Sequence, residues 1–143
     1  MITSNTRIGE NFAGKPKRMT LPRLLMFSGG SLSASGFPRA NIHTNDAFAR
    51  NTGLPGLCAS GTQYQGNLVE LLIDVFGDRW FTSGRLDARL TSLVHENVVV
   101  TAHASITAKE TLADGTKFTA DVWSERDDGE KVLVGTASCV LPA

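Results

Sequence analysis

The sequence has few cysteines, no long apolar run and no net charge. Its two cysteines, Cys58 and Cys139, are too few for a disulfide scaffold. The chain opens without an apolar stretch of signal-peptide type, so we expect both thiols to be reduced and the protein to be cytoplasmic, with a single disulfide as the alternative. No run of about 18 apolar residues exists, which excludes a predicted membrane span. Lys+Arg and Asp+Glu each number 14, and this balance argues against nucleic-acid binding.

Several motifs that carry chemistry are also missing. A structural zinc site needs about four ligands, usually arranged as short Cys/His pairs, and the three histidines and two cysteines form no such pair. No acidic cluster suggests a divalent cation. The segment Ser28-Gly29-Gly30-Ser31 lacks the lysine of a phosphate-binding loop, and no Gly-x-Ser-x-Gly elbow is present. We therefore expect no metal and no cofactor.

What is present suits one domain over residues 1–143, with 41% apolar and 20% charged residues. The charge is unevenly divided. Residues 1–50 hold seven Lys and Arg against two Asp and Glu, a net charge of +5, and residues 51–143 hold seven against twelve, a net charge of −5. This division predicts either a solvated surface with attraction between the two parts or a basic rim for an anionic ligand.

Glycine, proline, serine and asparagine are frequent in the first 60 residues, which predicts irregular chain with short elements. Residues 21–27 form one candidate helix, with Pro22 in its first turn. Residues 46–50 form a second, with Asn45 or Asp46 as the N-cap and Gly53 at the end.

The strongest helix signal covers residues 61–76. Its apolar residues recur at helical spacing on almost every side, and only Glu70 and Asp74 interrupt them. A helix that is apolar nearly all round is typically buried. Ser60 is a plausible N-cap and Gly77 a plausible end.

After Gly77 apolar residues alternate with polar ones, which predicts strands. The alternating stretches are residues 86–91, 98–107, 118–123 and 132–135, with turns at Asp114-Gly115 and Asp128-Gly129. We expect these four consecutive strands to form an antiparallel meander whose apolar face is covered by the helix. The predicted fold class is α+β, with a sheet wrapped around one central helix.

Two short segments could carry chemistry. His43 lies in a polar loop before a capped helix, and a histidine there is either a surface residue or a general base. The turn from Cys58 to Thr62 opens the long helix, and it is either a simple N-cap or an oxyanion site. The amides of Gly61 and Thr62 lack intrahelical partners and could stabilise negative charge on a carbonyl oxygen. We expect His103 to face solvent or an interface, and His95 to lie in a turn between two strands.

Three segments together resemble the MaoC-like dehydratases and (R)-specific enoyl-CoA hydratases of the hotdog fold. Residues 41–49 are similar to the family's hydratase segment, a histidine followed by a short helix. Residues 53–61 are similar to the Gly-x-Pro…Ala-(His/Ser)-Gly turn that leads into its central helix. Residues 86–92 and 98–108 resemble the long strands that follow.

The resemblance implies a hotdog domain that pairs its sheet with a second subunit, so we expect a homodimer or a higher homo-oligomer. It implies an acyl thioester of coenzyme A or a carrier protein as substrate, and hydration of an α,β double bond or its reverse. A related small carbonyl compound is the other substrate considered. His43 matches the catalytic histidine. Gly61 matches the glycine whose N–H holds the thioester carbonyl, and Ser60 matches the polar residue beside it. With these we place Cys58 and Thr62 among the substrate-binding residues.

One departure from the family pattern is large. The catalytic aspartate lies five residues before the histidine, and this position holds Pro38. The Asn-Pro pair is replaced by Ala40-Asn41, and an inserted stretch covers residues 28–35. Asn41 can orient a water or a carbonyl and is the second predicted catalytic residue, but it exchanges no proton at neutral pH.

The missing aspartate leaves several functions open. Another residue replaces it, the reaction needs one base, or the site only binds. The first prediction is a hydratase or dehydratase with His43 as the base. The alternatives are a thioesterase or double-bond isomerase of the same fold, and a non-catalytic partner subunit or binding protein.

Overall fold

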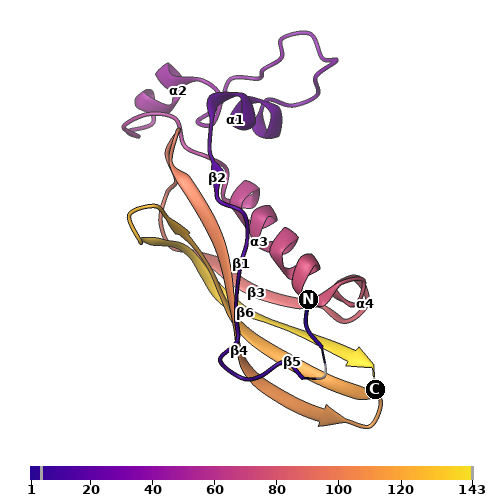
Figure 1. Cartoon of the computed structure of the whole chain (residues 1–143). Coiled ribbons are helices and arrows are strands. Elements are labelled where there is room, and N and C mark those ends of the chain that lie inside the picture. The colour runs from indigo at the N-terminus through magenta and orange to yellow at the C-terminus, as the bar shows by residue number, and fades with distance from the viewer. Residues whose placement is uncertain (4, 143) are drawn as a thin grey trace.

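A six-stranded antiparallel sheet packs against one long helix, which confirms the predicted α+β class (Figure 1). The structure is a computed structural model that describes residues 1–3 and 5–142. In chain order the elements are β1 (Asn11–Ala13), β2 (Lys17–Arg18), α1 (Leu21–Ser28), α2 (Asp46–Asn51), α3 (Gly61–Phe76), α4 (Arg79–Ser83), β3 (Arg85–Leu90), β4 (Val99–Leu112), β5 (Gly115–Arg126) and β6 (Lys131–Pro142).

The strand order is β1-β4-β5-β6-β3, with β2 also paired to β4. Strands β4, β5 and β6 form the expected meander, but the prediction that β3 precedes them in it is wrong, because β3 pairs with β6. The segment after β3 carries the chain away instead of turning back, and Val94 in it accepts a hydrogen bond from the amide of Ala59. Gly135 on β6 permits the pairing, since a Cβ there would lie 2.1 Å from the carbonyl oxygen of Asp87.

The three predicted helices are present. Asn45 caps α2 through a hydrogen bond from the amide of Phe48 to Asn45 Oδ1 (2.8 Å). Ser60 precedes α3 as expected, but its hydroxyl lies 2.8 Å from that of Thr62 and makes no capping bond to the backbone. Helix α3 is buried on one side only, which corrects the expectation of a helix buried all round. Leu68 and Leu72 are fully buried, while the side with Glu70 and Asp74 is exposed.

Three short elements escape the sequence patterns. Strands β1 and β2 hold three and two residues, and α4 holds five. Each is shorter than the window over which a hydrophobic period can be recognised, so tertiary contacts define it. Trp80 of α4, for example, stacks on Phe76 at the end of α3, with ring centroids 5.9 Å apart.

The core lies between α3 and the face of the sheet that it covers. Its fully buried residues include Leu68, Leu72, Ala104, Ile106, Phe118 and Val132. Helices α1 and α2 and the loop between them extend beyond the sheet, next to the first turn of α3 (Figure 1). No helix within residues 1–3 and 5–142 is long and apolar enough to cross a membrane.

Candidate functional site

His43 is held against the chain segment that leads into α3. Its Nδ1 lies 2.8 Å from the carbonyl oxygen of Cys58. A carbonyl oxygen can only accept a hydrogen bond, so Nδ1 carries the proton in the neutral ring. The other nitrogen, Nε2, then has a free lone pair. The contact therefore fixes the tautomer that a general base needs.

Asn41 braces the loop that carries His43. Its Oδ1 accepts a hydrogen bond from the amide of His43 (2.8 Å), and its Nδ2 donates to the carbonyl oxygens of Ser28 (2.9 Å) and Arg39 (3.2 Å). All of these partners are backbone atoms. The side chain thereby connects the end of α1 to His43, and these contacts engage both polar ends of its amide.

The backbone before α3 is fixed on both sides. The amide of Ala59 donates to the carbonyl oxygen of Val94 (2.7 Å), and the amide of Glu96 donates to that of Leu57 (3.1 Å). Within the described residues, the amides of Gly61 and Thr62 have no acceptor. These first N–H groups of the helix carry partial positive charge and can stabilise an anionic oxygen.

Gly61 is required by a close neighbour. A Cβ at this position would lie 2.2 Å from Cδ1 of Leu90, so the two residues are in direct contact. Leu90 ends β3 and is 52% exposed. The missing side chain at residue 61 therefore lets the end of β3 pack against the start of α3.

A cavity of about 320 Å³ joins these groups. Its lining residues are Ile42, His43, Cys58, Ala59, Gly61, Tyr64 and residues 90–93. Three of the six predicted site residues thus share one cavity, namely His43, Cys58 and Gly61. Asn41 binds the backbone of His43 but does not line the cavity, and neither does Ser60. Thr62 lines a separate groove along the exposed side of α3.

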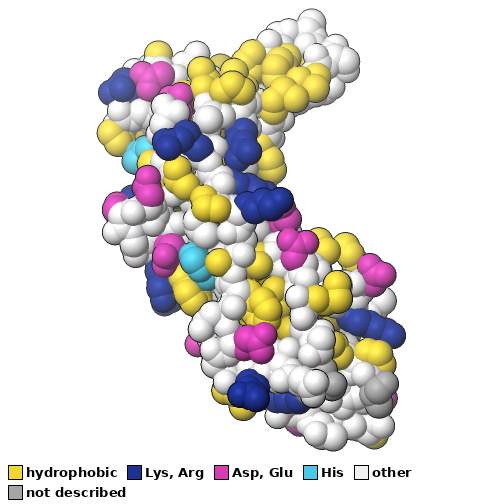
Figure 2. Space-filling view, viewed as in Figure 1, with side chains coloured by type: hydrophobic (Ala, Val, Ile, Leu, Met, Phe, Trp, Pro, Cys, Tyr) yellow, Lys and Arg dark blue, Asp and Glu magenta, His cyan; other side chains and the backbone are white. Residues whose placement is uncertain are grey.

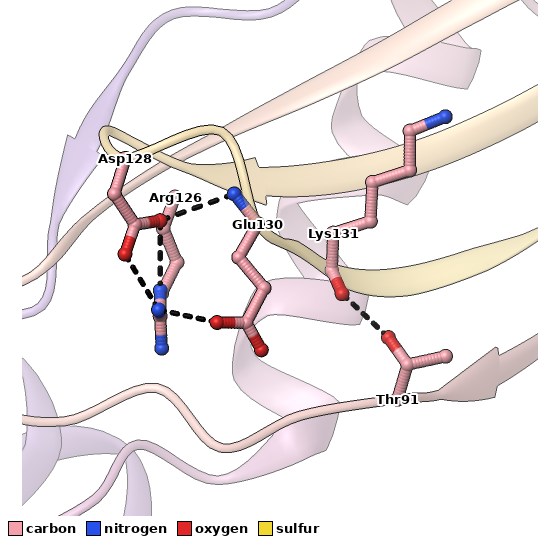
Figure 3. Close-up of polar contacts among 5 residues, drawn as sticks. All are labelled: Thr91, Arg126, Asp128, Glu130 and Lys131. Carbon is pink, nitrogen blue, oxygen red and sulfur yellow. Dashed lines mark hydrogen bonds and ion pairs between the residues drawn. The ribbon is translucent and has the colours of Figure 1, made fainter.

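The wall formed by residues 90–93 is tied to two elements. Thr91 Oγ1 donates to the carbonyl oxygen of Lys131 at 2.7 Å, and Figure 3 shows this contact beside the β5–β6 hairpin. The same view shows Arg126 bound to Asp128 and Glu130, which braces the hairpin. On the other side Tyr64 donates its hydroxyl proton to the carbonyl oxygen of Ser92 (3.2 Å).

Sequence reasoning missed Thr91 and Tyr64 as site residues. Tyr64 is the only tyrosine in the chain and sits at an apolar position of the α3 pattern, so its spacing indicates only a core residue. Thr91 follows an alternating stretch and has no local signal. The polar hydroxyl of a buried tyrosine, which needs a partner, is the one clue the sequence contains.

Cys58 is not placed as a nucleophile. Burial raises the pKa of its thiol above the ordinary value, which favours the neutral form. Its Sγ lies 3.8 Å from Nδ1 of His43, but that nitrogen already faces the carbonyl oxygen of Cys58. Burial, and then the neighbouring Cys58, also raise the pKa of Tyr64, so its hydroxyl is a proton donor at neutral pH. Both cysteines are free and buried.

The described residues that line this cavity include no Asp or Glu. The nearby loop has Pro38 where the family pattern has its aspartate, and Asp46 of α2 forms an ion pair with Arg50 (2.6 Å). His95 and His103 do not line this cavity. Nδ1 of His95 lies 3.3 Å from the carbonyl oxygen of Leu57, and His103 stacks on Trp123 over the sheet. The cavity therefore has a candidate base, His43, and a lining residue with a free amide, Gly61.

Comparison with known structures gives strong matches. The MaoC-like dehydratase from Rhodospirillum rubrum has a TM-score of 0.79 and 17% identity, over 99% of this chain and 97% of that one. The (R)-hydratase PhaJ1 from Pseudomonas aeruginosa has a TM-score of 0.76 and 15% identity, over 97% of this chain and 84% of that one. A chain of the ChsH1–ChsH2 complex from Mycobacterium tuberculosis has a TM-score of 0.72 and 15% identity, over 95% of this chain and 98% of that one. No protein-family model and no curated protein sequence matches.

These likenesses extend over nearly the whole chain, and they include the antiparallel sheet and central helix that the resemblance of residues 41–61 implies. Identities of 15–17% carry the comparison of folds and leave the activity to be argued from the site. The chain has the hotdog fold of the MaoC-like dehydratases and (R)-hydratases.

Proposed function

We propose that the protein is a hydro-lyase that adds water to an enoyl thioester or removes it from a 3-hydroxyacyl thioester. One observation carries the proposal: the carbonyl oxygen of Cys58 holds Nδ1 of His43, so Nε2 is the nitrogen left to act as the base, and His43 and Gly61 line the same cavity. The free amides of Gly61 and Thr62 are the groups that would polarise the thioester carbonyl.

The dehydration direction uses one base twice. Nε2 of His43 takes the proton from the α-carbon, and the electrons of the C–H bond form an enolate whose oxygen binds the amides at the start of α3. The C–O bond at the β-carbon then breaks as the double bond forms. The leaving hydroxyl takes the proton from His43, so water departs and the base is restored. Hydration is the reverse.

The test is hydration of crotonyl-CoA in H₂¹⁸O, with the 3-hydroxybutyryl product followed by mass spectrometry. Substitution His43→Ala should lower the rate by about two to four orders of magnitude, as expected for loss of a general base. The matched control is His103→Ala, because His103 lies outside the cavity. Full activity in His43→Ala would remove the role assigned to His43.

We also propose a homodimer built on β3. This strand pairs only with β6 among the described strands, so one of its edges is open. An antiparallel pair of β3 strands centred on Ala88 sets Asp87 of one copy opposite Arg89 of the other, and Leu86 opposite Leu90. Each unlike-charge pair and each apolar pair then occurs twice in the dimer.

The free, buried thiols of Cys58 and Cys139 support a reducing, cytoplasmic location.

A second candidate is a non-catalytic subunit that binds a catalytic hotdog chain. The observation in its favour is the absence of Asp and Glu from the cavity-lining residues, together with Pro38 in the loop. One of the similar structures is a complex of two differently named proteins, ChsH1 and ChsH2. Crotonyl-CoA turnover by the purified chain alone would exclude this candidate.

Thioester hydrolysis and double-bond isomerisation are lesser alternatives. Hydrolysis by this fold would need a carboxylate at the reacting carbonyl, and Glu70 is bound to Lys17 on a different side of α3. Isomerisation needs one base, which His43 supplies. Release of a free thiol from crotonyl-CoA would identify hydrolysis, and conversion of a β,γ-enoyl thioester without uptake of ¹⁸O would identify isomerisation.

A further inference from the structure

A second cavity, of about 330 Å³, lies between α3 and the segment formed by β2 and α1. It is distinct from the His43 cavity, because the two share no lining residue. Its principal lining residues are Lys17, Met19, Arg23, Phe27, Gln63 and Asn67. Two cations, two amides and two apolar side chains thus surround one space.

The two amides on α3 have unused hydrogen-bonding atoms. Nε2 of Gln63 donates to the carbonyl oxygen of Arg23 (3.3 Å), which fixes the orientation of the amide and leaves Oε1 without a donor. Nδ2 of Asn67 has no acceptor among the residues that the structure describes, and both atoms are buried. Buried polar atoms without partners are unfavourable. A small turn of the two side chains into the cavity would let one ligand hydroxyl or amide satisfy both.

The cavity also has an uncompensated positive charge. Arg23 is exposed and donates only to the carbonyl oxygen of Arg18 (3.3 Å), with no carboxylate partner among the residues of the structure that are described. Lys17 contacts Glu70, so its charge is balanced. Figure 2 shows Lys and Arg side chains gathered on this face around β2, in the part of the chain with a net charge of +5. This arrangement favours an anionic group.

Two features connect this cavity to His43. Gly61 and Gln63 both belong to the first turn of α3 and lie on different sides of it, so the two cavities flank the same turn. Phe27 in the wall precedes Ser28, whose carbonyl oxygen binds Asn41, and Asn41 in turn binds the amide of His43. A ligand that passes around the first turn of α3 would extend from the reacting carbons near Gly61 into the second cavity.

We propose that the cavity between α1 and α3 binds the end of the substrate that carries an anion next to an amide or hydroxyl group. The proposal rests on the proposed function, because it places the reacting carbons of that same substrate at His43. Two sources share this chemistry. One is the phosphate-and-amide arm of a coenzyme A or carrier-protein thioester, and the other is an acyl group that ends in a carboxylate.

Isothermal titration with four saturated thioesters, which have neither a double bond to hydrate nor a β-hydroxyl to eliminate, separates the sources. The probes are butyryl-CoA, succinyl-CoA and the N-acetylcysteamine thioesters of the same two acids, which lack phosphates. The variant is Arg23→Met, which keeps an unbranched apolar side chain and removes the charged guanidinium group, and the control is Arg7→Met, an exposed arginine outside the cavity. Loss of one charge-assisted hydrogen bond should weaken affinity about tenfold.

The pattern of that loss identifies the anion. Weaker binding of both CoA thioesters, with the N-acetylcysteamine pair unchanged, assigns the cavity to the phosphate-bearing arm. Weaker binding of the succinyl probes alone assigns it to a carboxylate. In either case Gln63→Leu should weaken the same probes, and Arg7→Met should weaken none.

Equal affinities in wild type and Arg23→Met for every probe would overturn the proposal, as would a wild type that binds none of them. These titrations require no turnover, so they are separate from the test of the hydro-lyase. If the protein hydrates crotonyl-CoA but Arg23→Met binds every probe as tightly as the wild type, the proposed function stands and the anion site is wrong. If the protein is inactive but Arg23→Met shows the predicted loss of affinity, the anion site stands and the proposed function is wrong.

Discussion

Nδ1 of His43 donates a hydrogen bond to the carbonyl oxygen of Cys58 across 2.8 Å, and this contact joins the polar loop to the start of α3. The two residues are 15 positions apart, and the chain between them folds away into α2 and the turn after it. A base is thereby positioned at a cavity that also exposes Gly61, whose amide is the expected carbonyl-binding group.

Removal of the Asn41 side chain should disorder the position of His43. Asn41→Ala deletes hydrogen bonds to His43, Ser28 and Arg39 and leaves partly buried backbone groups without partners. We expect about 1–3 kcal/mol of lost stability in thermal or denaturant unfolding. The rate of crotonyl-CoA hydration should fall further than stability alone explains. Asn51→Ala, at the exposed end of α2, is the control and should change neither.

The contact of Gly61 with Leu90 should appear as coupling between substitutions. Gly61→Ala places a methyl group 2.2 Å from Cδ1 of Leu90, so it should destabilise the protein unless Leu90 shifts. In the double variant with Leu90→Ala the clash is absent. Its loss of unfolding free energy should therefore be smaller than the sum of the losses in the two single variants. Denaturant unfolding of the four proteins measures this. Strict additivity would mean that the two side chains are not in contact.

The proposed β3 pairing predicts a charge swap. Asp87→Arg and Arg89→Asp each place like charges opposite one another in the dimer and should weaken it. The double variant restores unlike pairs and should recover the wild-type association. Sedimentation equilibrium over a dilution series would show this. If all four proteins associate equally, the dimer uses another surface.

Stability should fall at alkaline pH because of two buried groups. Burial raises the pKa values of Cys58 and Tyr64 in the folded chain. Above the ordinary pKa values of 9.0 and 10.0 the unfolded chain loses these protons while the folded chain still holds them, so the unfolded state is favoured. The free energy of unfolding should therefore decline as pH rises past about 9. Cys58→Ala should make the first part of this decline shallower, and an unchanged slope would contradict the assignment.

The sequence predicts the parts of the fold that are encoded locally. Helix α3 is predicted to the residue because sixteen residues carry one period and Gly77 ends it with a positive φ of 63°. The pairing of β3 is not predicted, because alternation identifies a strand but not its neighbour. The neighbour is set by the route of residues 91–98 past Ala59, which is a long-range contact.

The candidate site divides in the same way. His43 and Gly61 are recognised from short motifs, and the structure places both at one cavity. The backbone contact of His43 with Cys58 and the tether from Thr91 to Lys131 depend on segments far apart in the chain. The engagement of Asn41 with backbone atoms is likewise absent from its local pattern, which suggested contact with water or substrate.

The most direct test of the account is exchange of the α-protons of butyryl-CoA in D₂O, followed by NMR. This reaction needs only the base and a polarised carbonyl, so it bypasses the carboxylate that the family pattern has at Pro38. The account predicts exchange with the wild type and with His103→Ala, and loss of exchange with His43→Ala. Exchange that persists in His43→Ala, or that is absent from the wild type, would contradict the assignment of His43 as the base.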